Sequence, residues 1–303
     1  MKRRLVGPVV AASILWPAVA GAQTPVTPPL VLTTTASTRA MALGGAYMMN
    51  AGHADALFHH PALLTNASGF GLEVQRWAGH GSATAASAAM GWFGGGVAVG
   101  LQTLQAGMQR AYVPRGQDDL FTTGEVPLSE RVATVGYART FFGVQVGVAG
   151  KLVDERLGGA HSSTVLVDAG AARQVGPLTV GLTVRDIGDD PFETDGDLGP
   201  ARVVLGAGAY GRQLGPLDVG LAGHLSYASE ETVYGGGLEL GYWPISGRTF
   251  VARIGVQNAP EGSAADPFTF GFAFWGDDLV LEWAYQGFGD LDVGTHRFGV
   301  RWR

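Results

Sequence analysis

The 303-residue sequence contains no cysteine. Without cysteine, the chain can form neither a disulfide framework nor a metal site built from thiolates. Its stability must therefore come from the packing and hydrogen bonding of its secondary structure.

Positive charge and long apolar runs are also scarce. The chain has 20 Lys+Arg against 26 Asp+Glu, and the basic residues are scattered rather than gathered in a run. This distribution argues against a nucleic-acid partner. After residue 22, no apolar run approaches the roughly 18 residues that a membrane-spanning helix needs, so helical spans are excluded.

The first 22 residues have the pattern of a signal peptide. Residues 2–4 are basic, residues 5–19 are apolar, and residues 20–22 (AGA) form a small-residue cleavage site. An uncleaved membrane anchor is the alternative, but the apolar segment is short and contains two prolines. The sequence therefore predicts export of a chain that begins after residue 22.

Glycine is the residue present in excess, at 48 of 303 residues, where about 7% is usual. The glycines do not follow the strict three-residue period of collagen, and a hydrophobic content of 46% argues against disorder. An exported, glycine-rich chain without apolar helices leaves two fold classes. One is a soluble β-sandwich or propeller, and the other is an outer-membrane β-barrel.

The alternation of side chains distinguishes these two classes. In residues 178–185 (LTVGLTVR), leucine and valine occupy one face, and threonine, glycine and arginine the other. Segments 144–151 and 217–227 repeat the pattern, and the second face is mostly small rather than long and solvated, which suits a crowded barrel interior. Segment 267–275 (PFTFGFAFW) carries an aromatic stripe that is a hazard in water and ordinary in a bilayer.

We predict an all-β fold, a transmembrane antiparallel β-barrel of about 14 strands with a short N-terminal helical plug. Short turns alternate with longer outer loops, of which residues 106–128 form the longest, and aromatic residues gather near both strand ends. The strand lengths suit an oblique crossing of the bilayer. The predicted strands are 70–78, 82–92, 95–105, 129–140, 143–155, 163–174, 177–187, 201–213, 216–228, 231–243, 248–258, 267–275, 278–287 and 293–302.

The plug is predicted from an alanine-rich segment that precedes the first strand, residues 38–64 (TRAMALGGAYMMNAGHADALFHHPALL). This segment resembles the N-terminal signature of the FadL-like superfamily of long-chain fatty-acid transporters, which includes the PorV/PorQ proteins. Members typically read R-A-x-x-M/L-G-G-A and later A-L-Y/F-x-N-P-A. The matching residues are Arg39, Ala40, Leu43, Gly44, Gly45, Ala46, Ala54, Ala56, Leu57, Phe58, Pro61 and Ala62.

In that superfamily the segment forms short helices and a loop inside or under the barrel, so the resemblance implies a plug. Gly44 and Gly45 permit close packing against a glycine-lined wall, and Pro61 ends the last turn before the first strand. A helix that merely caps one end of the barrel is the alternative. The expected division is a signal peptide (1–22), an N-terminal extension with the plug (23–68) and the barrel (69–303).

Two features depart from the superfamily pattern. His60 replaces the usual asparagine before proline, and Gly52 and His53 replace the acidic pair, which leaves only Asp55 nearby. The chain is also short for a fatty-acid transporter. Both features favour the smaller PorV/PorQ-like branch. The expected plug motif consists of Arg39, Gly44, Gly45, Asp55, His60, Pro61 and Ala62.

Catalytic and metal-binding patterns are not indicated. His53, Asp55, His59 and His60 match no metal signature, and a polar lumen can hold neutral histidines by hydrogen bonding. No G-x-S-x-G elbow occurs, His224 has no obvious partner, and the glycine runs lack the Lys and Ser/Thr of a phosphate loop. We expect no enzyme, no metal and no cofactor.

Charged residues that face a narrow lumen are costly unless they are paired. Counting residues outward from each predicted turn or loop supplies partners on the neighbouring strand, with unpaired placement in a water-filled lumen as the alternative. The expected pairs are Asp168 with Arg185, Glu239 with Arg253, and Glu282 with Arg297.

Three function classes remain open. The superfamily implies a conduit or binding protein for small hydrophobic molecules, and the PorV/PorQ branch implies an interaction protein that meets an exported protein or a secretion component. The third class is a purely structural protein, and the mixed polarity of loop 106–128 does not choose among them. The expected location is the outer membrane of a Gram-negative-type bacterium. Membrane lipid and the barrel-assembly machinery are expected partners, and nucleic acid is not.

Overall fold

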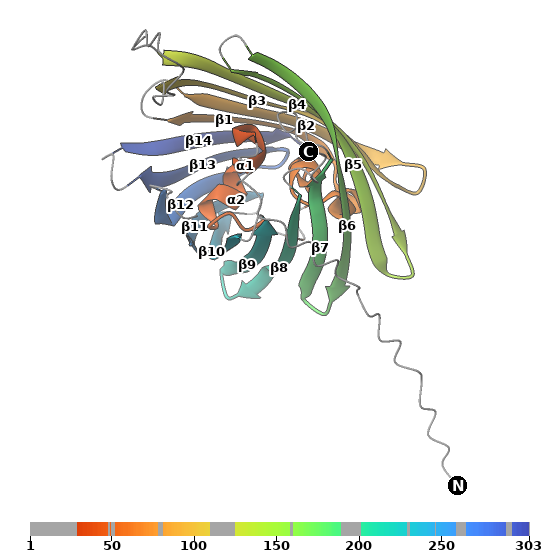
Figure 1. Ribbon diagram of the computed structural model, residues 1–303. Helices are drawn as coiled ribbons and strands as arrows, with labels where there is room; N and C mark the ends of the chain where they lie inside the picture. Colours follow the sequence, from red (N-terminus) through yellow and green to blue (C-terminus); the bar gives the residue numbers. More distant parts are fainter. Residues whose placement is uncertain are drawn as a thin grey trace, which may run out of the picture.

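The computed structural model describes a closed barrel (Figure 1). Within the described residues, fourteen antiparallel strands each pair with their sequence neighbours, and β1 pairs with β14 to close the sheet. The predicted fourteen-stranded barrel is thereby confirmed, and the predicted signal peptide lies outside the described residues. The described residues are 29–47, 49, 52–77, 81–109, 125–157, 160–188, 201–228, 231–245, 247–258, 265–288 and 293–302.

The strands lie close to their predicted positions. The largest difference is at β3 and β4, which continue to Gln109 and start from Glu125, inside the predicted loop 106–128. Backbone pairing continues there without the alternating pattern, so residues 106–109 and 125–128 extend the ladder. The strands are β1 (Gly69–Trp77), β2 (Ser82–Trp92), β3 (Gly95–Gln109), β4 (Glu125–Phe141), β5 (Val144–Leu157), β6 (Ala160–Val175), β7 (Leu178–Ile187), β8 (Arg202–Leu214), β9 (Leu217–Ala228), β10 (Glu231–Ile245), β11 (Arg248–Gln257), β12 (Ala265–Trp275), β13 (Leu279–Phe288) and β14 (Val293–Trp302).

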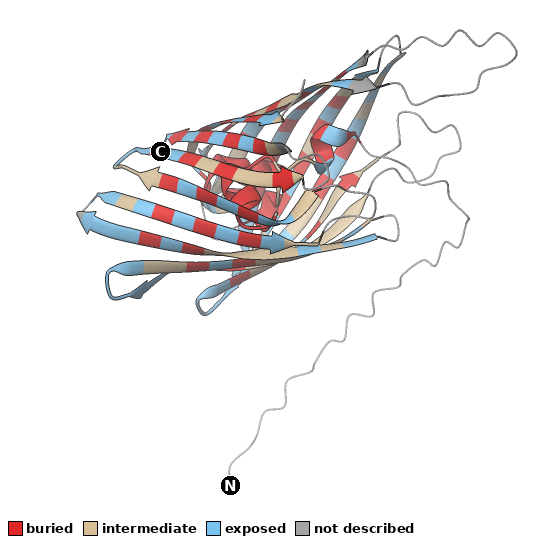
Figure 2. Ribbon diagram, turned by 90° about the vertical axis from the view of Figure 1, so that its left-hand side faces the viewer, coloured by how far each residue is buried: buried red, intermediate tan, exposed pale blue. Residues whose placement is uncertain are grey.

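Burial alternates along each strand, with side chains pointing by turns into the lumen and outward (Figure 2). On β12, the outward Phe268, Phe270 and Phe272 are 66%, 42% and 57% exposed. Phe274 is half-buried because it packs on Phe250, with ring centroids 5.3 Å apart. An apolar surface of this kind is stable in lipid and costly in water, so the outside of the barrel is its lipid-facing surface.

Two tight turns place a non-glycine residue at positive φ. Phe93 (φ 45°) precedes Gly94, and Phe142 (φ 50°) precedes Gly143. Positive φ at both central residues gives the primed turn whose twist matches that of the flanking strands. These turns keep β2 with β3, and β4 with β5, in register up to their ends.

Among the described residues, four short helices lie inside the barrel, drawn in red and orange in Figure 1. We call the described residues between 29 and 68 the lumenal segment. No helix among the described residues is long and apolar enough to span a membrane. The helices are α1 (Leu30–Thr33), α2 (Thr38–Ala42), η1 (Ala54–Phe58) and η2 (Pro61–Asn66).

Candidate functional site

Two helices of the lumenal segment, α2 and η2, begin with residues that suit a helix start. The Ser37 side chain accepts a hydrogen bond from the backbone N–H of Ala40 at the start of α2. Pro61 occupies the first turn of η2, where its missing N–H leaves no donor unsatisfied. The following chain turns at Ala67 and enters β1.

One side of the lumenal segment packs against the glycine-lined wall formed by β3 to β6. A Cβ atom on Gly147 would overlap the backbone of Pro61 and Ala62, and one on Gly96 would overlap the carbonyl of Leu64. The backbone of η2 therefore touches the wall directly. The apolar cluster beside it includes Leu57 and other residues of η1 and η2, with alanines from the strands.

Gly44 and Gly45 stand where the chain bends back after α2. Their φ angles are 65° and 78°, in the left-handed region that side chains other than glycine seldom adopt. A Cβ on Gly44 would also collide with the backbone carbonyl of Val256. Both the conformation and the close approach therefore require glycine at position 44.

The opposite side of the segment is held by buried charges. The Arg39 guanidinium donates to both carboxylate oxygens of Glu239, with N–O distances of 2.8 and 2.6 Å. It also lies over the rings of Tyr210 and Trp275, at 4.8 and 5.4 Å from their centroids. On the wall, Arg253 completes the site by donating to Glu239 at 2.5 Å.

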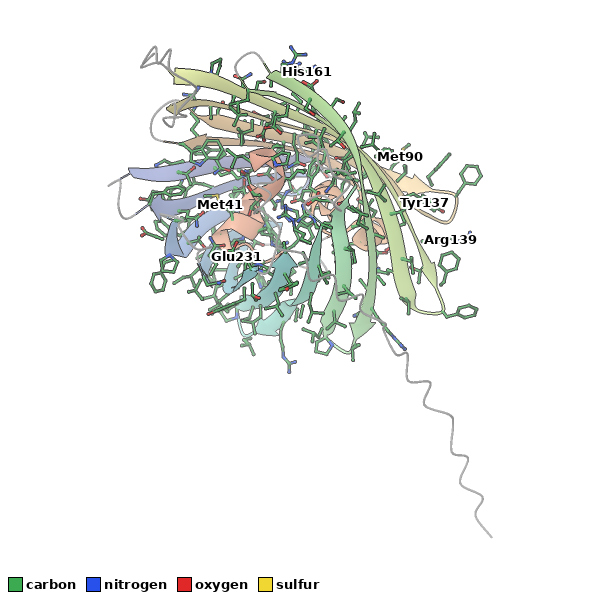
Figure 3. The ribbon with its side chains drawn as sticks, viewed as in Figure 1. Met41, Met90, Tyr137, Arg139, His161 and Glu231 are labelled. Carbon is green, nitrogen blue, oxygen red and sulfur yellow. The ribbon has the colours of Figure 1, made fainter. Side chains whose placement is uncertain are left out.

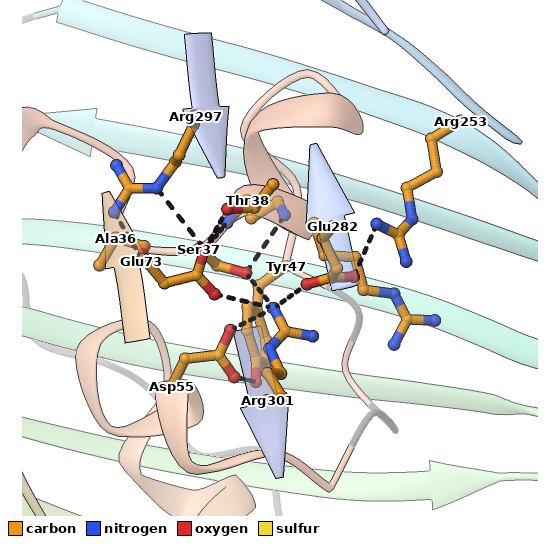
Figure 4. Close-up of polar contacts among 12 residues, drawn as sticks. Ala36, Ser37, Thr38, Tyr47, Asp55, Glu73, Arg253, Glu282, Arg297 and Arg301 are labelled. Atoms are coloured by element: carbon orange, nitrogen blue, oxygen red, sulfur yellow. Dashed lines mark hydrogen bonds and ion pairs between the residues drawn. The ribbon is translucent and has the colours of Figure 1, made fainter. Parts of the chain in front are cut away.

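A second charged centre surrounds Arg301 (Figure 4). Its Nη2 lies 3.0 Å from Asp55, 3.3 Å from Glu73 and 2.8 Å from Glu282. Burial alone would raise the pKa of Asp55, but the charges of Arg301, His53 and His59 and a hydrogen bond with Ser37 together outweigh it and hold the pKa of that carboxyl well below its usual range. Tyr47 donates a hydrogen bond of 2.9 Å to the other Asp55 oxygen.

Two further contacts fasten the start of α2 to β1 and β14. Glu73 accepts hydrogen bonds from the backbone N–H of Thr38 at 3.0 Å and from its hydroxyl. Arg297 donates to the carbonyl of Ala36 at 2.8 Å and to Gln75 at 2.6 Å. Charges from three strands, β1, β10 and β14, thus contact residues 36–55 of the lumenal segment.

Of the three predicted charge pairs, the structure brings together Glu239 and Arg253, which lie directly opposite each other on β10 and β11. The expected pair of Glu282 with Arg297 is wrong. The register sets Glu282 opposite Gly299, which is two residues from Arg297. Glu282 and Arg297 therefore both face the lumen, but Glu282 pairs with Arg253 and Arg301.

The expected pair of Asp168 with Arg185 is also wrong, because a β-bulge interrupts the register between β6 and β7. Asp186 takes a φ of 59° at the bulge and donates its backbone N–H to Asp168. The cation that meets both carboxylates is Lys151, at 2.7 Å from Asp168 and 2.6 Å from Asp186. Arg185 instead lines an internal cavity of the barrel.

Glu73, Lys151 and Arg301 belong to this arrangement but were not predicted from the sequence. Each occupies an inward position that strand alternation predicts. Asp168 and Glu282 lie on the strands next to Lys151 and Arg301 but two residues from the directly paired position, and other partners lie across the β1–β14 closure or on the lumenal segment, so alternation alone does not identify them. The plug-motif residues all lie on the lumenal segment as numbered, and Arg39 and Asp55 are those that contact the wall through charge.

Above the lumenal segment lies a cavity of about 1070 Å³. Its lining includes residues at the loop ends of the strands, such as Trp77, Ala228 and Phe288, and residues of the segment itself, such as Tyr47 and Phe58. It therefore extends from the loop ends of the strands to the lumenal segment, which forms its floor. Other apolar residues of the lining are Leu32, Met41, Met49, Leu104, Val204 and Val233.

Imidazole groups of the lumenal segment and guanidinium groups of the barrel wall also line the cavity. Burial lowers the pKa of His59 to about 3 and that of His60 to about 4, so both rings are neutral near pH 7. Within the described residues, neither ring nitrogen of His60 has a hydrogen-bond partner, and the same holds for Nε of Arg185. The described histidines and acids form no cluster of three or more that could hold a metal ion.

A closed antiparallel barrel with an apolar outside and a helical segment in its lumen defines a transmembrane barrel of the outer-membrane type. The sequence matches no protein-family model and no curated protein. Comparison with solved structures, however, shows which barrels share its fold.

Three solved structures are similar over nearly their whole length. The Pseudomonas putida toluene transporter TodX has a TM-score of 0.50 at 10% identity, covering 86% of this chain and 95% of that one. The TodX deltaS2S3 mutant monoaromatic hydrocarbon channel has a TM-score of 0.57 at 12% identity, covering 88% and 97%. A Pseudomonas aeruginosa FadL homologue has a TM-score of 0.52 at 8% identity, covering 88% and 98%.

The chain therefore has the fold of the FadL-like outer-membrane barrels, as its N-terminal resemblance implied. At 8 to 12% identity the similarity concerns the fold alone. None of these three structures is a PorV or PorQ protein, so the resemblance to that branch stays a prediction.

Proposed function

We propose that this protein is a plugged conduit or binding protein for small hydrophobic molecules in the outer membrane of a Gram-negative-type bacterium. The cavity of about 1070 Å³ that ends on the lumenal segment carries this proposal. Small-molecule sites are concave and combine apolar and aromatic side chains with polar groups, and this cavity is lined by both kinds of side chain in similar number. TodX, which shares the fold, is named as a toluene transporter.

The lumenal segment would act as the plug. Its η2 backbone rests on Gly147 and Gly96, and its other side is held through Arg39 and Asp55. Such a segment closes the lumen while it is docked, and a molecule in the cavity can pass only when the segment shifts. On this proposal, residues 23–68 form the extension with the plug, residues 69–303 form the barrel, and residues 1–22 are the cleaved signal peptide.

A secretion-associated role stays a prediction without structural support. Residues 110–124 of loop 106–128, through which we would expect such a partner to be met, lie outside the described residues. A non-enzymatic role agrees with the transporter and channel names of the TodX structures.

The proposal is tested by filling the cavity. Val204 points into it from β8, and the adjacent Leu205 points outward and is 52% exposed. Cells that make the Val204→Trp variant should take up radiolabelled toluene or long-chain fatty acid more slowly than cells with the parent protein, because the indole occupies part of the cavity. Leu205→Trp is the matched control, since it adds the same side chain on the lipid side of the same strand.

The comparison requires equal amounts of heat-modifiable, folded barrel in all strains. If cells with the parent protein took up neither probe faster than cells without it, the conduit would be refuted for these probes. Equal slowing by Val204→Trp and Leu205→Trp would show that uptake does not depend on the cavity.

A further inference from the structure

The outward surface of the barrel changes from apolar to polar across a sharp boundary on β3 to β6. Outward residues that pair across these strands form rows, so the change can be located from the register. The apolar row consists of Leu101, Ala133, Leu152 and Val165. The next row toward the loops consists of Thr103, Arg131, Asp154 and Ser163, and the row beyond it of Gln105, Ser129, Arg156 and His161.

The two polar rows hold more positive than negative charge. Asp154 accepts contacts from Arg156 at 3.3 Å and from His161 at 2.6 Å. Arg131 lies directly opposite Asp154, yet among the described residues it forms no ion pair within 4.0 Å. The Asp154 carboxylate therefore contacts one guanidinium group and an imidazole, and the side chains of Arg156 and His161 are 59% and 56% exposed.

This polar patch lies on one side of the barrel and extends beyond β3 to β6. The row of Gln105, Ser129, Arg156 and His161 continues through Ser82 on β2 and Arg76 on β1 to His296 on β14. At the loop ends of β9 to β12, by contrast, the exposed outward residues include Leu225, Tyr227, Tyr234, Val256 and Phe268. His161 marks the patch in Figure 3, at the loop ends of β5 and β6. The basic groups thus occupy one side of the barrel rather than a uniform belt.

We propose that Arg131, Arg156 and His161 form a docking site for the phosphate groups of an outer-leaflet lipid. Guanidinium groups bind phosphate through paired, charge-assisted hydrogen bonds. Outward residues at the loop ends of a barrel lie at the level of the outer headgroups, where basic side chains attract anionic lipid. Gln105 and Ser129 supply further donors in the same row.

The neighbouring apolar row identifies the occupant as a lipid rather than free phosphate. Leu152 and Val165 are 53% and 63% exposed and lie two residues along their strands from Asp154 and Ser163. A bound molecule must therefore offer phosphate to the guanidinium groups and hydrocarbon to the row beside them. The inference rests on the proposed outer-membrane location and is independent of what passes through the lumen.

The test measures lipid binding to the purified full chain in detergent micelles by native mass spectrometry. The probe is bis-phosphorylated lipid A, with phosphatidylethanolamine and inorganic phosphate as comparisons. Arg131→Gln together with Arg156→Gln should weaken lipid A binding at least tenfold. Arg173→Gln, an exposed outward arginine near the turn end of β6, should change it less than twofold.

Asp154→Asn provides a second variant with the opposite sign. Removal of the competing carboxylate should strengthen lipid A binding about threefold, so the site can be tested even if the double variant does not fold. Unchanged binding in Asp154→Asn and in the folded double variant would overturn the proposal. Equal retention of phosphatidylethanolamine, or binding of inorganic phosphate as tight as that of lipid A, would overturn the assignment of a phosphorylated lipid. Toluene uptake plays no part in these outcomes, so failure here leaves the conduit proposal intact.

Discussion

Arg39 offers the sharpest test of how the lumenal segment is held. Arg39→Met keeps an unbranched apolar side chain and removes the guanidinium that meets Glu239 at 2.6 and 2.8 Å. Glu239 remains buried and retains Arg253 at 2.5 Å, so its charge is not left alone. The substitution should therefore weaken the docking of the segment without unfolding the barrel.

The size of the effect follows from the burial of the pair. Removal of one partner from a buried ion pair costs about 3 to 5 kcal/mol, and the remaining Arg253 places the expected loss near the lower limit. The contacts with the rings of Tyr210 and Trp275 are lost as well. A loss of about 3 kcal/mol corresponds to roughly a hundredfold increase in the population of the undocked segment.

The absence of cysteine makes this population measurable. In an Ala46→Cys background, the introduced cysteine is the only thiol, and Ala46 is fully buried while the segment is docked. A polar maleimide reacts there only after local opening, so its rate follows the opening equilibrium. Arg39→Met should raise the labelling rate about a hundredfold.

Two controls accompany the measurement. Ser226→Cys lies in the cavity and should label at the same rate with and without Arg39. Arg76→Met makes the same substitution at an exposed, outward arginine of β1 and should leave the rate at Ala46→Cys unchanged. A rise of less than threefold in Arg39→Met, or an equal rise in Arg76→Met, would refute the reasoning.

Three further predictions concern the plug and the barrel. Gly147→Val should displace η2 and raise single-channel conductance in planar bilayers. Gly150→Val should not, because no heavy atom lies within 4 Å of a Cβ at Gly150. Equal conductance of the two variants would contradict the contact between Gly147 and η2. Burial lowers the pKa of His60 to about 4 in the docked segment, whereas His60 of an undocked segment would be protonated below its usual pKa of about 6.5. Protonation of His60 below pH 6.5 therefore favours the undocked segment. Conductance should therefore rise as pH falls from 6.5 to 4, and His60→Asn should reduce that dependence to the part due to His59, whose pKa is lowered to about 3; an unchanged profile in His60→Asn would remove His60 from it. Trp302→Ser should impair membrane insertion, measured by heat-modifiable mobility, more than deletion of Arg303, since Trp302 is 57% exposed on the outside of the last strand; equal effects would contradict its assignment to assembly recognition.

Strand positions and faces could be predicted because both depend on local pattern. Alternation in residues 178–185 predicted that Leu182 faces outward and Thr183 inward, and they are 46% and 0% exposed. The ladder between β10 and β11 is regular from Gly235 to Tyr242, and in this stretch Glu239 and Arg253 meet as expected, although the register shifts between Tyr242 and Ile245 nearer the turn.

The partners of Asp168 and Glu282 depended on features that alternation does not encode. A shift of two residues leaves both faces unchanged and still exchanges partners, as at Glu282, and a single bulge at Asp186 redirects Asp168 to Lys151. The side-chain pattern has a period of two, so it cannot distinguish registers that differ by two.

The sequence by itself determined the exported, cysteine-free, fourteen-stranded pattern, which of its faces is apolar, and the presence of a distinct N-terminal segment, because composition and period are properties of neighbouring residues. Only the tertiary structure decided that Arg301 gathers Asp55, Glu73 and Glu282, which lie 246, 228 and 19 positions away along the chain. Closure of the barrel brings its first and last strands, β1 and β14, side by side, and the lumen then confines the segment against these strands. In that confined space each buried charge takes the nearest opposite charge in three dimensions, whatever its separation in sequence.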